Sequence, residues 1–149
     1  MMEQADQKPD ESLFSRIDQI GVVVRSVDEC VRRYEPIFGE GSFVVVEGEA
    51  PARLGNGQEV MIKGKLAFFQ LGPVQVELIE IQEGPSIHLD FLKNHGEGIH
   101  HVAMYVSDFD GRLAEFRKKG FRVLQQGQGL RRYAYLDTKP FVLELIESG

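Results

Sequence analysis

Residues 96–106 read GEGIHHVAMYV, a turn that contains two glycines followed by a mostly apolar run. The run is rich in β-branched and aromatic residues and predicts a strand that begins near Ile99. Successive side chains of a strand point to opposite faces, so we expect His100 and His101 to lie on opposite sides of the sheet. The rest of the chain is best understood from this strand, because its pattern occurs twice.

The first copy of the pattern lies at residues 17–24, IDQIGVVV, which align without a gap with residues 99–106, IHHVAMYV. A second matching pair is VELIE at residues 76–80 and LELIE at residues 143–147. Matches at both ends of each half indicate an internal repeat. We therefore divide the chain into a disordered tail (1–12), a first module (13–82), a linker with a short helix (83–96) and a second module (97–149).

Each module is predicted to contain one strand, one helix and three further strands. Ser26, with Glu29 three residues later, predicts the start of the first helix, and Asp108 predicts the start of the second. Residues 49–64 are polar and interrupted by proline and glycine, which predicts a long loop. The predicted strands are residues 17–24, 42–47, 65–71, 74–81, 99–106, 121–124, 131–136 and 141–147. We expect an α+β fold in which two βαβββ modules form a curved eight-stranded mixed sheet, with helices on its outer face.

Composition excludes several classes of protein. The 149-residue chain has a net charge of -6, which argues against binding to nucleic acid. It has no apolar run near the roughly 20 residues of a membrane-spanning helix, and no apolar signal segment follows Met1. The single cysteine, Cys30, fits a reducing compartment. We expect a cytoplasmic protein without a membrane partner.

Four side chains that can bind metal occupy equivalent positions in the two modules. Gln19 and His101 lie in the opening strands, and Glu77 and Glu144 lie between aliphatic residues in the closing strands. A carboxylate buried among aliphatic residues is costly unless it has a partner. Without the repeat, four such residues would be ordinary solvated side chains on a sheet face. Because the repeat places them together, we favour a common metal site.

One imidazole, one amide oxygen and two carboxylates suit octahedral coordination of one divalent metal ion, such as Co, Mn, Ni, Zn or Mg. Such an ion can act as a Lewis acid on a substrate carbonyl. Glu77 and Glu144 are then the predicted catalytic groups, which remove and return a proton on the neighbouring carbon. The expected reaction is epimerisation or isomerisation through a metal-bound enolate or enediolate.

From Arg16 to Glu147 the sequence resembles the vicinal-oxygen-chelate (glyoxalase/bleomycin-resistance) superfamily, and within it the methylmalonyl-CoA epimerases. The resemblance rests on LAFFQLG at 66–72, VELIE at 76–80 and FLKNHGEGIHHVA at 91–103. It implies that His101, Glu77 and Glu144 are metal ligands. The epimerase pattern has histidine where this chain has Gln19, and glutamine there looks like the ligand set of some glyoxalase I enzymes.

The resemblance leaves three functions open. They are a metal-dependent epimerase of an acyl-CoA such as methylmalonyl-CoA, a lactoylglutathione lyase of the glyoxalase I type, and a metal-free small-molecule binding protein. Retention of the four positions favours the enzymes, whereas a ring-cleaving dioxygenase would need histidine in place of Gln19. We therefore expect a thioester or hemithioacetal substrate and, by analogy, a homodimer.

Two further groups of residues lie outside the predicted metal site. Arg131, Arg132 and Tyr133 are predicted to bind substrate, because arginine is a good bidentate partner for carboxylate and phosphate. His88 and His95 fall in the linker and are expected to be solvated.

Overall fold

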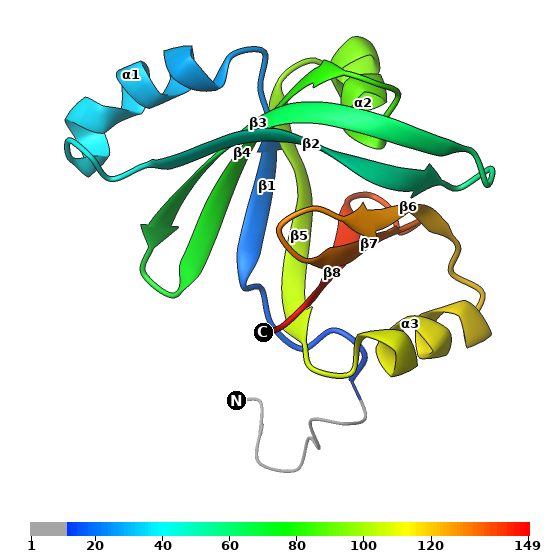
Figure 1. The fold of residues 1–149 in the computed structure, drawn as a ribbon. Helices are drawn as coiled ribbons and strands as arrows, with labels where there is room; N and C mark the ends of the chain where they lie inside the picture. Colours follow the sequence, from blue (N-terminus) through cyan, green and yellow to red (C-terminus); the bar gives the residue numbers. More distant parts are fainter. Residues whose placement is uncertain (1–11) are drawn as a thin grey trace.

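The computed structural model describes residues 12–149, and this part of the chain contains three helices and eight strands. The predicted tail falls, except for Ser12, outside the described residues. The strands close into a barrel, shown in Figure 1. The elements are β1 (Gln19–Val23), α1 (Val27–Phe38), β2 (Val44–Leu54), β3 (Glu59–Leu71), β4 (Val74–Glu83), α2 (Ile87–His95), β5 (Gly98–Val106), α3 (Phe109–Lys118), β6 (Val123–Gln128), β7 (Arg132–Leu136) and β8 (Val142–Glu147).

The order of strands around the barrel is β1-β4-β3-β2-β6-β7-β8-β5. Each half of the chain therefore contributes four neighbouring strands in the same order, 1-4-3-2 and 5-8-7-6. The pairs β1–β4 and β5–β8 are parallel, and all other neighbours are antiparallel. The predicted α+β class with an eight-stranded mixed sheet is confirmed, and the curvature of the sheet continues to full closure.

The two halves meet in antiparallel pairs at β1–β5 and at β2–β6. At the first junction Gln19 lies opposite Ala103, and Gly21 lies opposite His101. In the repeat, Gln19 aligns with His101 and Gly21 aligns with Ala103. The two facing pairs are therefore equivalent, as expected for a two-fold relation between the halves.

The prediction of a loop at residues 49–64 is wrong. β2 and β3 continue through these residues as one hairpin, and Arg53 still lies opposite Glu59 near its tip. The end of β2 also pairs with β6, where Leu54 lies opposite Gln125, so the hairpin closes the barrel (Figure 1). The proline and glycine residues of this stretch led to the wrong prediction. β2 pairs with β6 only from Ala52 onward, and a proline beside an unpaired edge removes no ladder hydrogen bond there.

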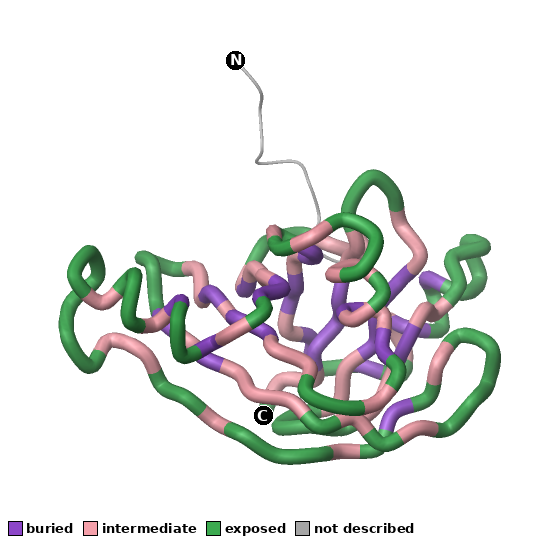
Figure 2. Tube along the Cα trace, turned by 90° about the horizontal axis from the view of Figure 1, so that it is seen from above, coloured by how far each residue is buried: buried purple, intermediate pink, exposed green. Residues whose placement is uncertain are grey.

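Helices α1 and α3 cover the outer face of the barrel, each over its own half. Both predicted caps are present: the Ser26 hydroxyl accepts a hydrogen bond from the Glu29 amide at 3.2 Å, and the Asp108 carboxylate accepts one from the Gly111 amide at 3.1 Å. Figure 2 shows the buried residues gathered beneath the helices and along the strands. One outer core contains Val27, Cys30, Ala67, Phe69, Val76 and Leu78, and the other contains Met104, Val106, Phe109, Leu113, Phe116, Leu136 and Leu145.

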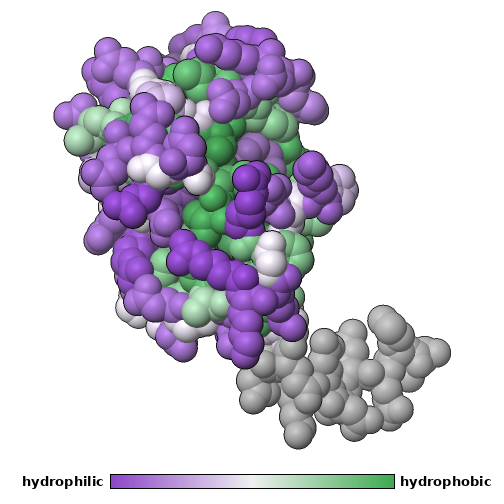
Figure 3. All heavy atoms as spheres, turned by 90° about the vertical axis from the view of Figure 1, so that its right-hand side faces the viewer, coloured by the Kyte–Doolittle hydropathy of each residue, from purple (hydrophilic) through white to green (hydrophobic). Residues whose placement is uncertain are grey.

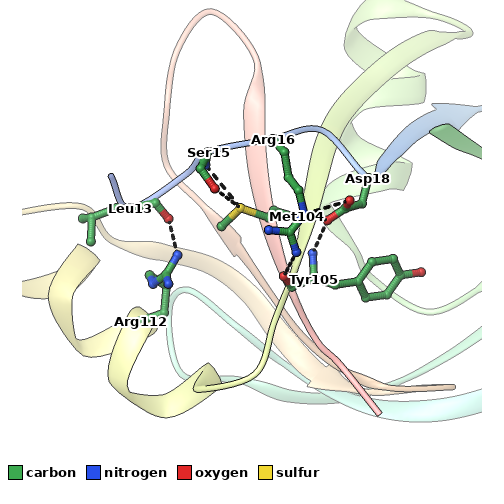
Figure 4. A network of polar contacts seen from close by, with 7 residues as sticks. All are labelled: Leu13, Ser15, Arg16, Asp18, Met104, Tyr105 and Arg112. Atoms are coloured by element: carbon green, nitrogen blue, oxygen red, sulfur yellow. Dashed lines mark hydrogen bonds and ion pairs between the residues drawn. The ribbon is translucent and has the colours of Figure 1, made fainter. Parts of the chain in front are cut away.

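The segment that leads into β1 is tied to the second half of the chain (Figure 4). The Leu13 carbonyl accepts a hydrogen bond from Arg112 of α3 at 2.9 Å. Asp18 accepts one from the Tyr105 amide of β5 at 2.9 Å, and the guanidinium of Arg16 donates to the Tyr105 carbonyl at 2.7 Å. These contacts fix the register of β1 on β5 and so place the side chain of Gln19.

The surface mixes polar margins with an apolar strip. On the face shown in Figure 3, hydrophobic residues form a central band between hydrophilic ones. Within residues 12–149, every helix is too short or too polar to cross a membrane.

Candidate metal centre

The centre is built on four neighbouring strands, in the order β4-β1-β5-β8. In the parallel pair β1–β4 Glu77 lies beside Gly21, and in the parallel pair β5–β8 Glu144 lies beside Ala103. Since Gly21 also lies opposite His101, both carboxylates flank the strand pair that carries the imidazole. The repeat predicted from the sequence thus brings His101, Glu77 and Glu144 together.

The imidazole of His101 is fully buried, and its Nε2 atom points to both carboxyl groups. This atom lies 3.1 Å from Glu144 Oε1 and 3.9 Å from Glu77 Oε1. One ligand atom from each of these residues falls within 4.8 Å of the other two. Because the ring is closed off from solvent, these two carboxyl groups are the polar groups that its Nε2 faces.

Gly21 provides the space that the His101 ring occupies. A Cβ atom at Gly21 would overlap Cε1 and Nε2 of His101 and would stand 2.6 Å from Nδ1. The equivalent position in the second half is Ala103, which carries a methyl group and faces the more slender side chain of Gln19. The absence of a side chain at Gly21 is therefore a requirement of the site rather than of a turn.

Gln19 is buried and lines the same cavity as Glu77 and Glu144. Its Nε2 donates a hydrogen bond to Gln75 Oε1 at 2.8 Å. This bond orients the amide and leaves its Oε1 buried without a hydrogen-bond partner among the described residues. An amide oxygen held in this way can serve as a metal ligand.

Burial governs the ionisation of the cluster. It raises the pKa of Glu77 to about 8, and repulsion from Glu144 adds to the rise. Burial also raises the pKa of Glu144 to about 8, although a hydrogen bond from the Tyr135 hydroxyl opposes the shift. It lowers the pKa of His101 to about 4. At neutral pH the imidazole is neutral, and the carboxyl pair retains a proton when no cation is present.

The prediction that His100 and His101 lie on opposite sides of the sheet is wrong. Their Nδ1 atoms are 2.9 Å apart, and both rings are buried. The register of β1 on β5 shifts here: Gly21 faces His101 and Val22 faces Ile99, so His100 is an extra residue. Such a β-bulge turns a side chain away from its regular direction.

The prediction that His88 is solvated is also wrong, whereas His95 is exposed as expected. His88 lies on α2, is buried and lines the cavity. Its Nε2 is 3.0 Å from the Tyr135 hydroxyl. Tyr135 lies opposite Glu144 in the β7–β8 pair and so joins α2 to the carboxyl cluster.

Glu77 and Glu144 lie on the wall of a cavity of about 790 Å³ inside the barrel. His101 is fully buried and is not part of the lining. The apolar lining comes mainly from β2, β3 and β4, and includes Val46, Ile62, Leu66, Phe68, Ile79 and Ile81. Of the three residues predicted to bind substrate, Arg131 and Tyr133 line the cavity. Arg132 does not, because it forms ion pairs with Asp110 at 2.6 Å and Glu147 at 3.4 Å.

The fold and the cluster can be compared with known proteins. A family profile described as Glyoxalase/Bleomycin resistance protein/Dioxygenase superfamily matches residues 18–135. The chain belongs to this superfamily. The resemblance inferred from the sequence motifs is thereby confirmed.

The solved structures that are similar to this chain include methylmalonyl-CoA epimerases. Methylmalonyl-CoA epimerase from Streptomyces coelicolor, solved with 2-nitronate-propionyl-CoA, is 25% identical with a TM-score of 0.67, covering 91% of this chain and 98% of that chain. The enzyme from Mycobacterium tuberculosis, at 22% identity and a TM-score of 0.65, covers 100% of this chain and 93% of its own, and supports the fold alone. The uncharacterized protein YqjC of Bacillus subtilis (strain 168) is 28% identical over 142 residues, or 90% of this chain and 93% of that protein.

The donor set of this superfamily member fits a divalent cation. In the described part of the chain, Gln19 Oε1, His101 Nε2 and Glu144 Oε1 are all buried without a hydrogen-bond partner. Although His101 Nε2 and Glu144 Oε1 are 3.1 Å apart, they are not aligned for a hydrogen bond with each other. Adjacent ligands at about 2.0–2.2 Å from one cation are separated by about 3 Å. Two carboxylates also balance the charge of the cation.

Sequence analysis missed three residues that support the centre, namely His88, Tyr135 and Gln75. Strand alternation could have identified Tyr135, because it places this residue on the same face as Tyr133, which was predicted to bind substrate. Gln75 could have been found in the same way, because it shares a face with Glu77. Nothing in the sequence signalled His88, whose position depends on how α2 docks against β1, β4 and β5.

Proposed function

We propose that this chain is a metal-dependent epimerase or isomerase that moves a proton on the carbon next to a thioester carbonyl, with a methylmalonyl-CoA-like acyl thioester as its substrate. The observation that carries the proposal is the convergence of His101, Glu77 and Glu144 on one point, with the two carboxyl groups on the wall of an apolar cavity. The similarity to methylmalonyl-CoA epimerases supports the substrate class.

Gln19, Glu77, His101 and Glu144 would hold the cation, which when bound would act as a Lewis acid on the thioester carbonyl and so acidify the neighbouring carbon. Neutral His101 and an unpartnered amide oxygen are suited to this role, since both present lone pairs without a competing proton.

Glu77 and Glu144 are the proposed proton-transfer groups. They come from β4 and β8, on either side of the β1–β5 pair, and therefore approach a substrate from two directions. One carboxylate would accept the proton from the α-carbon, and the other, once protonated, would return a proton to that carbon. Removal from one face of the carbon and return to the other would invert its configuration.

The remainder of the cavity would bind and enclose the substrate. Its apolar walls would exclude water from the reacting carbon, and Tyr133 would lie beside the acyl group. Arg131 lines the cavity, donates to the Glu147 carbonyl at 3.3 Å, and has its guanidinium 5.7 Å from the centre of the Tyr105 ring. We assign it to a substrate carboxylate or phosphate.

The proposal is tested by deuterium exchange. Protein loaded with Co²⁺ is incubated with methylmalonyl-CoA in D₂O, and deuterium at the α-carbon is followed by mass spectrometry. We expect exchange in the wild type and at least about a 100-fold loss in Glu144→Gln, the usual scale for a lost proton-transfer group. Glu59→Gln, at the exposed hairpin tip, is the matched control. Absence of exchange with Co, Mn, Ni, Zn and Mg would refute the proposal.

A glyoxalase I-like lyase is the second candidate, and Gln19 favours it. Glutamine with two glutamates and one histidine looks like the ligand set of those enzymes, and the Gln19 amide oxygen is directed by its bond to Gln75. Formation of S-lactoylglutathione from methylglyoxal and glutathione, without exchange on acyl-CoA, would select this function. Tight binding of a small molecule with neither reaction and no metal would select the binding protein.

The location and assembly of the protein are part of the same proposal. We place it in the cytoplasm, for which the single buried thiol of Cys30 is the support. The homodimer expected from the resemblance is tested by light scattering on the purified protein.

A further inference from the structure

The β-bulge in β5 brings two neighbouring imidazoles into contact. Because His100 is the extra residue of the bulge, its ring turns toward His101, and the two Nδ1 atoms lie 2.9 Å apart. Both rings are buried, so this contact is not shared with bulk solvent. On a regular strand the two rings would lie on opposite faces and could not form it.

The contact restricts where the protons lie. A neutral imidazole has one N–H group and one lone pair, so one of the two Nδ1 atoms donates and the other accepts. Nε2 of His101 faces Glu144 and Glu77, and a metal ligand must present a lone pair there. The proton of His101 then lies on Nδ1, and His100 must accept it with its own proton on Nε2.

The ring of His100 is itself held in place by α2. Its centre lies 5.0 Å from the Phe91 ring in an edge-on arrangement, and 5.1 Å from the His88 ring. His101 is confined on its other side by Gly21, whose missing Cβ leaves just enough room for the ring. Both partners of the hydrogen bond are therefore fixed by packing before any metal binds.

We infer that His100 is a positioning residue that holds His101 in the Nδ1–H form and aims its Nε2 at the metal centre, an inference that rests on the proposed metal site. The bulge makes this hydrogen bond possible, because it turns the His100 ring toward His101. Hydrogen bonds of this kind to a metal-binding histidine usually contribute 10–100-fold to metal affinity.

Two substitutions separate the hydrogen bond from simple packing. His100→Leu removes the acceptor and keeps an apolar side chain, whereas His100→Asn can place its Oδ1 near the position of Nδ1 and accept the same bond. We expect Zn²⁺ to bind His100→Leu about 10–100-fold more weakly than the wild type, and His100→Asn within a few-fold of it. Calorimetric titration gives the affinities, and circular dichroism checks that each variant is folded.

Nitrogen-15 NMR of the histidine rings provides a readout that does not depend on metal. We expect the His101 proton on Nδ1 in the wild type and in His100→Asn, and a mixture with the Nε2–H form in His100→Leu. A wild-type spectrum with the proton on Nε2, or wild-type metal affinity in a folded His100→Leu variant, would overturn the inference. If the wild type binds no divalent metal, the proposed function fails, while the ring spectra of the metal-free protein still decide the role of His100.

Discussion

The substitution Gly21→Ala adds one methyl group at the most crowded point of the candidate centre. Gly21 has an extended backbone without a positive φ, so alanine introduces no backbone strain. The new Cβ would overlap two atoms of the His101 ring and stand 2.6 Å from a third, Nδ1. The three atoms nearest to the new Cβ all belong to His101, so the substitution acts first on this ring.

The size of the effect follows from these contacts. Carbon and nitrogen atoms in good contact are about 3.5–4.0 Å apart, so the ring must retreat by about 1 Å at Nδ1 and further at Nε2. Overpacking of this kind costs about 1–3 kcal/mol of stability. A displaced Nε2 can no longer meet the Glu144 and Glu77 oxygens at one cation. We expect metal affinity to fall at least about 100-fold, or about 2.8 kcal/mol of binding free energy.

Calorimetric titration with Co²⁺ or Zn²⁺ measures the affinity, and urea denaturation of the metal-free protein measures the loss of stability. Gly48→Ala is the matched control, because Gly48 also lies in a strand and its added Cβ would have no neighbour within 4 Å. The control should bind metal like the wild type. Wild-type affinity in Gly21→Ala would show that His101 does not hold the cation in this position.

Three further outcomes are expected. The metal-free protein should lose about 1–2 kcal/mol of stability between pH 7 and 8, because the buried carboxyl pair holds a proton up to a pKa of about 8 whereas unfolded carboxyls are already ionised. The buried histidines, whose pKa values are lowered, have the opposite effect on stability, and this effect falls mainly below pH 7. Saturating Co²⁺ should abolish this loss of stability. If urea denaturation shows the same dependence of stability on pH with and without Co²⁺, the carboxyl pair is not coupled to metal binding. Tyr135→Phe should cost about 1–3 kcal/mol in urea denaturation, because it leaves His88 Nε2 unpaired and removes a hydrogen bond from Glu144; an unchanged midpoint would argue against the network. Arg131→Gln should raise KM for an acyl thioester about tenfold with little change in kcat, while Arg132→Gln, outside the cavity, should leave both unchanged; equal effects would count against the assignment of Arg131.

The elements that could be predicted are those whose signals are local or repeated. Helix caps at Ser26 and Asp108 depend on residues three apart, and both are present. The repeat predicted that His101, Glu77 and Glu144 would converge, because equivalent strands in two halves occupy equivalent places around the barrel. The register of β1 on β4 and of β5 on β8 brings these side chains together as the repeat requires.

The features that escaped prediction depend on contacts between distant segments. Residues 49–64 form strands because β3 and β6 provide partners, and this pairing outweighs the breaker residues. The bulge at His100 depends on the register of β5 against β1, which alternation within one strand does not reveal. His88 is buried because α2 docks over the cavity, and a nine-residue helix in a linker carries no sign of where it will dock.

The two halves of the centre are equivalent in position but differ in their ligands and in the residues that face these ligands. In a symmetric barrel, the opening-strand ligand of each half would face the same small residue of the other half. Here the larger ligand, His101, faces Gly21, and the slimmer ligand, Gln19, faces Ala103. Glycine is required at position 21 because the His101 imidazole fills the space that a Cβ atom would occupy there. The asymmetry of the two facing positions therefore follows the asymmetry of the two ligands.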